Sequence, residues 1–262
     1  MTTYETLQID VDARGVAELV LNRPDKHNAL NAQMIAELTQ AATALGRDAS
    51  IRVVVLRGSG KSFCAGGDLG WMQDQMAADS ETRAREAGKL AYMLQALNTM
   101  PKPLIGAVHG NAFGGGVGMA SVCDVAIGAD HIKLGLTEVR LGLVPATIGP
   151  YVVARMGEGR ARRVFFSGRL FGAKEAVDLG LLASCVPSDA LNDEIAAQVE
   201  PYLSAAPEAV AAAKALTRSL GAKIDDSTIE ASIAALKAQW ETKEASDGIG
   251  AFFAKQKAPW MR

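Results

Sequence analysis

Three features of the sequence could together stabilise a negatively charged oxygen and move a proton. Two are glycine-rich stretches, AGGD at 65–68 and GGG at 114–116, and the third is Glu138, within the apolar, glycine-rich segment 133–150. Main-chain N–H groups with no side chain in front of them can bind an oxyanion. A carboxylate in apolar surroundings has a raised pKa, which suits a general base or acid. The combination predicts proton transfer beside a developing negative charge.

Each feature also has a purely structural interpretation. Glycine clusters occur in tight turns and at helix starts, where they need bind nothing. Glu138 could instead form a surface ion pair with Arg140, two positions along the chain. The residue types alone leave both interpretations open.

Two nucleotide-binding motifs are incomplete. GSGKS at 58–62 resembles the end of a P-loop, but position 55 is valine where the motif needs glycine, and FCAGGD follows instead of a helix. Around Gly114 and Gly118 no frame gives GxGxxG or GxGxxA, although Glu138 lies where a ribose-binding acid would be sought. Neither a nucleoside-triphosphate site nor a dinucleotide site is predicted.

Composition narrows the classes of protein. The 262 residues are 49% hydrophobic and 21% charged, enough for one large domain or a main domain with an appendage. The net charge of −2, with Lys and Arg scattered among acids, argues against nucleic acid or a membrane as partner. The start MTTYETLQID shows no targeting pattern, so a cytoplasmic protein is expected. The spacing of Cys64, Cys123 and Cys185 indicates neither disulfides nor a metal site.

Hydrophobic periodicity and turn residues predict the elements that position these features. A hairpin is predicted from 7–11 and 16–22, a helix from the N-cap Asn31 to Gly46, and a strand buried on both faces at 51–58. Residues 61–70 are predicted as a loop. Later strands are expected at 104–108, 124–129 and 132–135, and helices at 79–99, up to about 122, 149–156, 158–166, 173–179, 188–204, 207–220 and 225–247.

This order predicts a mixed α/β fold with parallel crossovers over roughly the first 190 residues and a helical tail. Each glycine stretch follows a buried strand of the same predicted sheet, so the two turns can converge. Residues 71–90 are expected to form the wall of any pocket beside these turns.

Five segments resemble a known family: LNRPDKHNAL (21–30), SFCAGGDL (62–69), PKPLIGAVHGNAFGGGVGMA (101–120), CDVAIGADHIKLGLTEVRLGLVP (123–145) and AFFAKQKAPW (251–260). In this order and at these separations they resemble the enoyl-CoA hydratase/isomerase, or crotonase, superfamily. The resemblance implies a crotonase-like spiral of ββα units over residues 1–195 and a helical trimerisation region over 196–262. It also implies an acyl-CoA thioester substrate, no cofactor apart from the coenzyme A of that substrate, and a homotrimer or hexamer.

The resemblance also assigns residues. The backbone N–H groups of Gly67 and Gly115 are expected to hold the thioester oxygen as it becomes an enolate, and Glu138 matches the family's second acid. Five further positions match residues that contact the acyl-CoA or hold its nucleotide end: Lys26, Ala65, Asp68, Leu69 and Gly70.

The sequence departs from the family pattern at Gly118. The family's two-glutamate hydratases read GGGxE, and here glycine stands at the fifth position, so the first acid is absent. A single base suits a Δ3,Δ2-enoyl-CoA isomerase, or a hydratase in which Glu138 both activates water and returns the proton. The missing acid also leaves open a catalytically silent acyl-CoA-binding subunit.

A finer resemblance favours hydration. AFGGGVG (112–118) together with EVRLGLVPATIGPYVV (138–153) is similar to the bacterial methylglutaconyl-CoA hydratases of leucine degradation. The leading expectation is therefore an enoyl-CoA hydratase, with 3-methylglutaconyl-CoA as a candidate substrate. The second carboxylate of that substrate would need a cation or hydrogen-bond donors, for which Arg140 and His109 are candidates.

Overall fold

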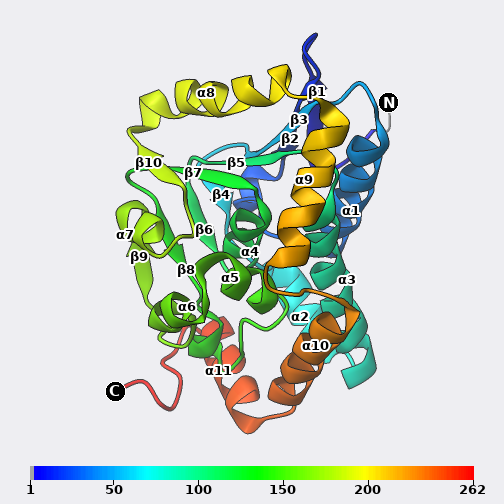
Figure 1. The fold of residues 1–262 in the computed structure, drawn as a ribbon. Coiled ribbons are helices and arrows are strands. Elements are labelled where there is room, and N and C mark those ends of the chain that lie inside the picture. Colours follow the sequence, from blue (N-terminus) through cyan, green and yellow to red (C-terminus); the bar gives the residue numbers. More distant parts are fainter. Residues whose placement is uncertain (1–2) are drawn as a thin grey trace.

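The computed structural model describes residues 3–262, which fold around two β-sheets (Figure 1). The larger sheet has the strand order β1-β2-β3-β5-β7-β10. Its strands are β1 (Leu7–Val11), β2 (Val16–Leu21), β3 (Val53–Gly58), β5 (Leu104–Val108), β7 (Val125–Ala129) and β10 (Ser184–Val186). β1 and β2 form the predicted antiparallel hairpin, and all other neighbours are parallel. The predicted parallel crossovers are thereby confirmed.

The smaller sheet has the order β4-β6-β8-β9. Its strands are β4 (Ser62–Cys64), β6 (Asn111–Phe113), β8 (Lys133–Gly135) and β9 (Leu170–Gly172). β4, β6 and β8 run parallel, and β9 is antiparallel to β8. The sequence predicted only β8 of these four and missed β10, because three residues are too few to display strand periodicity.

The chain steps repeatedly from the larger sheet to the smaller one. β3 is followed by β4, β5 by β6 and β7 by β8, in each case before a helix or helical turn. These steps form the predicted spiral of ββα units. Since β4, β6 and β8 are parallel neighbours, the turns after their carboxyl ends meet at one edge of the sheet. Those turns contain the two glycine stretches and Glu138.

Helices cover both sheets (Figure 1). Those up to residue 178 are α1 (Ala32–Arg47), α2 (Leu69–Ala77), α3 (Ser80–Thr99), α4 (Gly115–Val122), α5 (Gly149–Met156), α6 (Glu158–Phe165) and α7 (Ala173–Asp178), with short 3-10 turns η1 (Pro24–Lys26) and η2 (Glu138–Leu141). The side chain of Asn31 accepts a hydrogen bond from Met34 N at 2.9 Å, which confirms the predicted N-cap of α1.

The predicted loop over 61–70 is wrong at both ends. It contains β4, and α2 begins at Leu69. The signal for this helix is Asp68, whose side chain accepts hydrogen bonds from Gly70 N and Trp71 N and so forms an N-cap. The apolar residues of α2 show too little helical periodicity for the sequence to predict this short helix.

The C-terminal part consists of η3 (Ser188–Ala190), α8 (Leu191–Ser204), α9 (Pro207–Leu220), α10 (Asp226–Trp240) and α11 (Lys243–Phe253). The predicted single helix over 225–247 is therefore wrong. It is divided at residues 241–242, where Thr242 caps α11 by accepting from Ala245 N at 3.2 Å. The predicted division of the chain at 195/196 falls inside α8, so two separate folding units remain a prediction.

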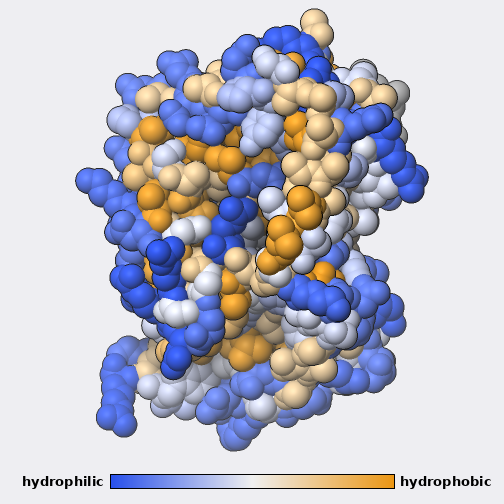
Figure 2. Space-filling view, in the orientation of Figure 1, coloured by the Kyte–Doolittle hydropathy of each residue, from blue (hydrophilic) through white to orange (hydrophobic). Residues whose placement is uncertain are grey.

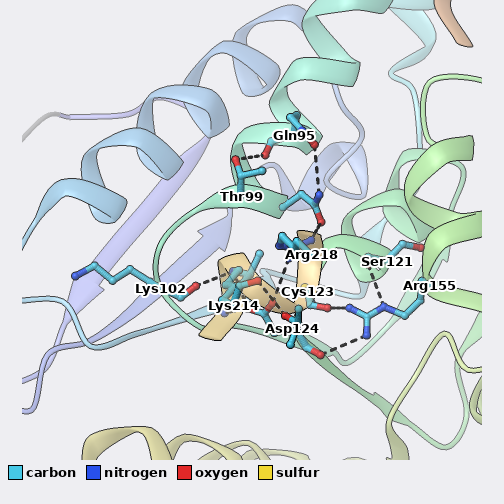
Figure 3. Close-up of polar contacts among 12 residues, drawn as sticks. Gln95, Thr99, Lys102, Ser121, Cys123, Asp124, Arg155, Lys214 and Arg218 are labelled. Atoms are coloured by element: carbon cyan, nitrogen blue, oxygen red, sulfur yellow. Dashed lines mark hydrogen bonds and ion pairs between the residues drawn. The ribbon is translucent and has the colours of Figure 1, made fainter. Parts of the chain in front are cut away.

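No residue of α9 is buried as a whole, but the side chain of Lys214 is only 8% exposed. Figure 3 shows how α9 is held: the carboxylate of Asp124 accepts hydrogen bonds from Lys214 Nζ at 2.7 Å and from Arg218 at 3.2 Å. The same carboxylate accepts from Leu104 N at 2.8 Å, which joins α9 to the start of β5. Burial lowers the pKa of Lys214, and Asp124 opposes that shift. Polar contacts therefore fix α9 on the core.

Candidate active site

The two glycine turns meet. Gly66, with φ of +93°, and Gly114, with φ of +47°, adopt backbone conformations that residues with a side chain rarely take. A Cβ added to Gly66 would lie 4.0 Å from the Cα of Gly114, and one added to Gly114 would lie 3.9 Å from the Cα of Gly66. The main chains of two turns distant in sequence are thus in close contact, as expected from the sequence.

The next two glycines are required by packing. A Cβ on Gly115 would lie 2.5 Å from Leu30 Cδ1, and one on Gly116 would lie 2.5 Å from the carbonyl oxygen of Cys64. Both distances are shorter than any normal contact. Glycine at these positions allows α4 to start directly against β4 and the chain before α1.

The N–H groups of Gly67 and Gly115 are free to bind a ligand. Leu30 forms a parallel bridge with Gly67: Leu30 N donates to Gly66 O at 2.7 Å, and Asp68 N donates to Leu30 O at 2.9 Å. Since the neighbours of Gly67 make these bonds, its own N–H points away from Leu30. Gly115 is the first residue of α4, where N–H groups lack helical acceptors. Within residues 3–262 neither N–H has a hydrogen-bond acceptor.

Glu138 lies on the same cavity as these N–H groups. The cavity, of about 590 Å³, is lined by Gly66, Gly67, Gly114, Gly115 and Glu138. Burial raises the pKa of Glu138 to about 7, and a hydrogen bond from its own backbone opposes the shift. Its Oε2 is buried and has no hydrogen-bond partner among the described residues. A carboxylate in this state can take up and release a proton near neutral pH.

Comparisons with known proteins agree with this geometry. The model of the enoyl-CoA hydratase/isomerase family matches residues 12–262. The chain belongs to this family. Among its relatives, crotonyl-CoA hydratase of Syntrophomonas wolfei is 33% identical over 262 residues, covering 98% of this chain and 98% of the relative.

Solved structures of the family share the fold. An enoyl-CoA hydratase from Shewanella pealeana is 35% identical, with a TM-score of 0.80 over 98% of this chain and 96% of that one. An enoyl-CoA hydratase from Mycobacterium avium is 27% identical, with a TM-score of 0.88 over 99% of this chain and 100% of that one. The predicted crotonase fold is confirmed.

In this family member, the C-terminal helices hold the turn that carries Glu138. η2 is followed by Gly142, with φ of +72°, where an added Cβ would lie 2.3 Å from Glu244 O at the start of α11. A Cβ on Gly248 in α11 would lie 2.5 Å from Leu141 O. Gln239 of α10 donates to Gly142 O at 2.8 Å. No sequence pattern connects residues 239–248 with Glu138, because only folding brings Gly142 against Glu244 and Gly248 against Leu141.

The cavity has mostly apolar walls from three parts of the chain. As predicted, residues 71–90 contribute, through Trp71, Met72, Gln75, Arg83, Ala87 and Leu90. The segment 143–148 forms a second wall. The third wall was not predicted and comes from the C-terminal region, including Leu236, Trp240 and Phe252. Three charged side chains line the cavity: Arg83, Glu138 and Arg140.

The predicted substrate-binding residues divide into two groups. Ala65 and Leu69 line the cavity, whereas Lys26, Asp68 and Gly70 do not. Lys26 lies exposed on η1. The Asp68 carboxylate is engaged by Arg23 at 2.9 Å and by the N-terminus of α2. Burial tends to raise the pKa of Asp68, but these hydrogen bonds hold it below its usual value. The binding roles of all five residues stay predictions.

Of the two cations proposed for a second substrate carboxylate, Arg140 lines the cavity and His109 does not. Arg140 lies on the 3-10 turn η2. No ion pair joins it to Glu138 within residues 3–262, so the surface-pair interpretation of Glu138 is wrong. His109 is not among the lining residues, and its Nε2 lies 3.1 Å from Gly60 O. Its position gives it no contact with the cavity.

Gly118 lies where the family's first acid would stand. A Cβ there would be 2.7 Å from Ile148 Cγ2 and 3.4 Å from Leu94 Cδ1. Two apolar side chains thus occupy the space into which a glutamate would project. Among the described residues, Glu138 is the one carboxylate that lines the cavity.

No group of three or more His, Cys, Asp or Glu side chains in residues 3–262 is arranged to bind a metal ion. Over the same residues, no helix has the length and apolar character needed to span a membrane.

Proposed function

We propose that this protein is an enoyl-CoA hydratase, a hydro-lyase that adds water across the α,β double bond of an acyl-CoA thioester. The observation that carries the proposal is the Glu138 carboxylate, whose Oε2 has no hydrogen-bond partner among the described residues, on the same cavity as the Gly67 and Gly115 N–H groups, which have no acceptor there. The relatives named hydratases, one of them a crotonyl-CoA hydratase, support it.

The two N–H groups bind the thioester oxygen. They draw electron density towards that oxygen, which makes the β-carbon electrophilic and stabilises the enolate formed by attack of water. One such donor typically contributes about 2.7–4 kcal/mol to lowering the barrier. The helix α4, whose N-terminus carries Gly115, adds a partial positive charge at the same place.

Glu138 moves the protons. As a carboxylate it removes a proton from water while the water oxygen bonds to the β-carbon. As a carboxylic acid it then returns that proton to the α-carbon, and the enolate collapses to the thioester. Water is added in full and Glu138 returns to its starting state. Because one group performs both tasks, a pKa near neutrality favours the cycle.

The variant Glu138→Gln tests this mechanism. It is expected to bind enoyl-CoA with near-normal affinity and to turn over about 10²–10⁴-fold more slowly, since the amide cannot exchange the proton. Glu158→Gln, an exposed glutamate on α6, is the matched control and should keep wild-type kcat. Unchanged turnover in Glu138→Gln would contradict the proposal.

The single carboxylate favours a second candidate, a Δ3,Δ2-enoyl-CoA isomerase. In that reaction Glu138 removes a proton from the α-carbon of a 3-enoyl-CoA and returns it to the γ-carbon without water. Incubation with a 2-enoyl-CoA in ¹⁸O-labelled water separates the two, because only the hydratase yields a labelled hydroxyacyl product. Saturable binding without reaction of any enoyl-CoA would instead identify a silent binding subunit.

The proposed substrate is 3-methylglutaconyl-CoA. Its second carboxylate would find Arg140, a cation on the cavity wall that makes no ion pair within residues 3–262. The test compares 3-methylglutaconyl-CoA with 3-methylcrotonyl-CoA, which lacks the carboxylate. Arg140→Gln should lower kcat/KM about tenfold or more for the dicarboxylic substrate only. The exposed Arg162→Gln is the control. Equal loss on both substrates would contradict the assignment of Arg140.

We also propose a homotrimer or a hexamer built from trimers. Hydrophobic side chains gather along α9 in Figure 2, where Leu216 and Leu220 are 57% and 77% exposed. Such exposed leucines, on a helix that has no fully buried residue, favour contact with another subunit. Light scattering of the purified protein measures the assembly, and Leu220→Gln should weaken it.

A further inference from the structure

The loop that carries Gly67 is held by a partly buried arginine, Arg23, which lies outside the cavity. Arg23 lies after β2, at the start of the segment that leads to α1. Its guanidinium donates to Ala29 O at 2.5 Å and to the Asp68 carboxylate at 2.9 Å. Ala29 and Asp68 flank Leu30 and Gly67, the two residues joined by the parallel bridge. One planar group therefore fastens together the two chains whose pairing directs the Gly67 N–H.

This contact is sheltered from solvent. The side chains of Arg23 and Asp68 are 17% and 14% exposed, unlike most ion pairs of the described chain, which have an exposed partner. A guanidinium suits the place because its donors have a fixed planar geometry and can serve two acceptors at once. An ammonium group has no such fork.

Asp68 extends the connection to α2. While one carboxylate oxygen accepts from Arg23, the other accepts from Gly70 N at 2.9 Å and from Trp71 N at 3.3 Å. Gly67 lies immediately before Asp68, and a Cβ added to Gly67 would lie 3.7 Å from the Trp71 ring. The position of Gly67 is thus fixed on one side by Leu30 and on the other by the N-cap of α2.

The segment carrying Arg23 is itself rigidly anchored. Asn28 is fully buried, accepts from Arg23 N at 2.9 Å, and donates to Ser59 O and Ser62 O, both at 2.8 Å. These bonds tie the segment to the chain on either side of the β3–β4 connection. Arg23 therefore holds the glycine loop from a fixed support.

We infer that Arg23 is a positioning residue for the reaction: through Asp68 and Ala29 it holds the Gly67 N–H in the direction needed to bind the thioester oxygen. The inference rests on the proposed function, because it concerns the same N–H donor. Arg23 does not line the cavity, so it acts on the substrate only through Gly67.

Two conservative variants test the inference. Arg23→Lys keeps the charge but not the planar fork, and Asp68→Asn keeps an oxygen able to cap α2 but not the charge. Each is expected to lower kcat by about 10–100-fold, because a shift of about 1 Å between the Gly67 N–H and the thioester oxygen is enough for a loss of that size. KM should change less than threefold or so, since most of the cavity wall is untouched.

A spectroscopic measurement separates positioning from folding. Hydrogen bonds to a thioester carbonyl lower its stretching frequency, so the shift on binding an enoyl-CoA reports the Gly67 and Gly115 donors together, and loss of the Gly67 contact reduces it. Both variants should show a smaller shift than the wild type, and hydrogen exchange should become faster in residues 62–71. Asp225→Asn is the matched control, because Asp225 likewise caps a helix, α10, and pairs with a cation, Lys223. It should retain wild-type kcat and carbonyl shift.

Wild-type kcat and carbonyl shift in Arg23→Lys and Asp68→Asn would overturn the inference while leaving the proposed function intact. The same holds if kcat falls only in proportion to the folded fraction and the carbonyl shift is unchanged. A wild-type protein that neither turns over enoyl-CoAs nor shifts the carbonyl frequency would overturn the proposed function, and the inference with it.

Discussion

The carboxylate of Glu138 lies against the main chain of Gly114, so closely that a Cβ added to Gly114 would stand 2.9 Å from Glu138 Oε1. Gly114 N also donates to Gly135 O at 3.0 Å, at the end of the strand that leads to Glu138. Since Gly115 follows directly, the proposed base and one proposed N–H donor are fixed relative to each other.

Gly114→Ala should therefore damage both activity and stability. The added methyl group displaces the Glu138 carboxylate, and kcat is expected to fall by about 10²-fold. The positive φ of +47° adds strain of about 1–3 kcal/mol to the folded state. Steady-state kinetics and chemical denaturation measure the two effects.

Gly157→Ala is the matched control for this variant. Gly157 has φ of +76°, and a Cβ there would meet nothing within 4 Å. It should lose about 1–3 kcal/mol of stability from the same kind of strain, with kcat unchanged. If the two variants lose activity equally, contact with Glu138 is not the cause.

The pH dependence of activity should follow Glu138. Burial raises its pKa to about 7, and only the carboxylate can accept a proton from water. kcat/KM is therefore expected to rise with pH and to level off above about 7. The inflection should disappear from the residual activity of Glu138→Gln. An inflection near 4.5, the usual value for glutamate, would show that the carboxylate is solvated.

The raised pKa of Glu138 also makes stability depend on pH. Activity should rise with pH, whereas the free energy of unfolding should fall. Between the unfolded value of 4.5 and the folded value of about 7, the folded protein binds a proton that the unfolded chain has lost. The free energy of unfolding should thus fall as pH rises through this window. At pH about 8, Glu138→Gln should be more stable than wild type by on the order of 1–3 kcal/mol, with a smaller difference near pH 5. Urea denaturation at both pH values checks this, and a constant difference would contradict it.

Restoring the family's first acid by Gly118→Glu should fail. The new side chain would collide with Ile148 and place a carboxylate among apolar groups. The expected result is a loss of stability of about 3 kcal/mol or more without a gain in kcat. The double variant Gly118→Glu/Ile148→Ala removes the nearest obstacle and should recover part of that stability. A double variant more stable than Gly118→Glu alone would support Ile148 as the obstruction. A Gly118→Glu variant with wild-type stability and a higher kcat would contradict it.

Loss of the contact between Lys214 of α9 and Asp124 should lower stability without changing kcat. Lys214→Met removes the donor that lies 2.7 Å from Asp124, where Arg218 and Leu104 N remain. A loss of about 1–3 kcal/mol is expected. Because no residue of α9 lines the cavity, kcat of the folded protein should not change. Lys243→Met, which breaks an exposed pair with Asp247, should lose less than about 1 kcal/mol. Equal losses would show that burial of the Asp124 contact adds nothing.

The sequence alone predicted five of the six strands of the larger sheet, the helix α1 and the glycine turns, but not β10. Residues 53–56 are buried throughout, and Asn31 and the apolar spacing of α1 carry local signals that need no other part of the chain. It also determined that Glu138, in an apolar segment, is a candidate base. These are properties of periodicity and residue type, which neighbours in sequence are sufficient to express.

Which of these groups come together depends on the tertiary structure. The three-residue strands β4, β6 and β8 pair side by side and bring Gly67, Gly115 and Glu138 to one cavity. The backing of Gly67 by Arg23, the support of Glu138 by α11 and the exclusion of His109 depend on contacts between residues far apart in the sequence. Such contacts follow from how whole elements pack, so no local pattern of residues reveals them.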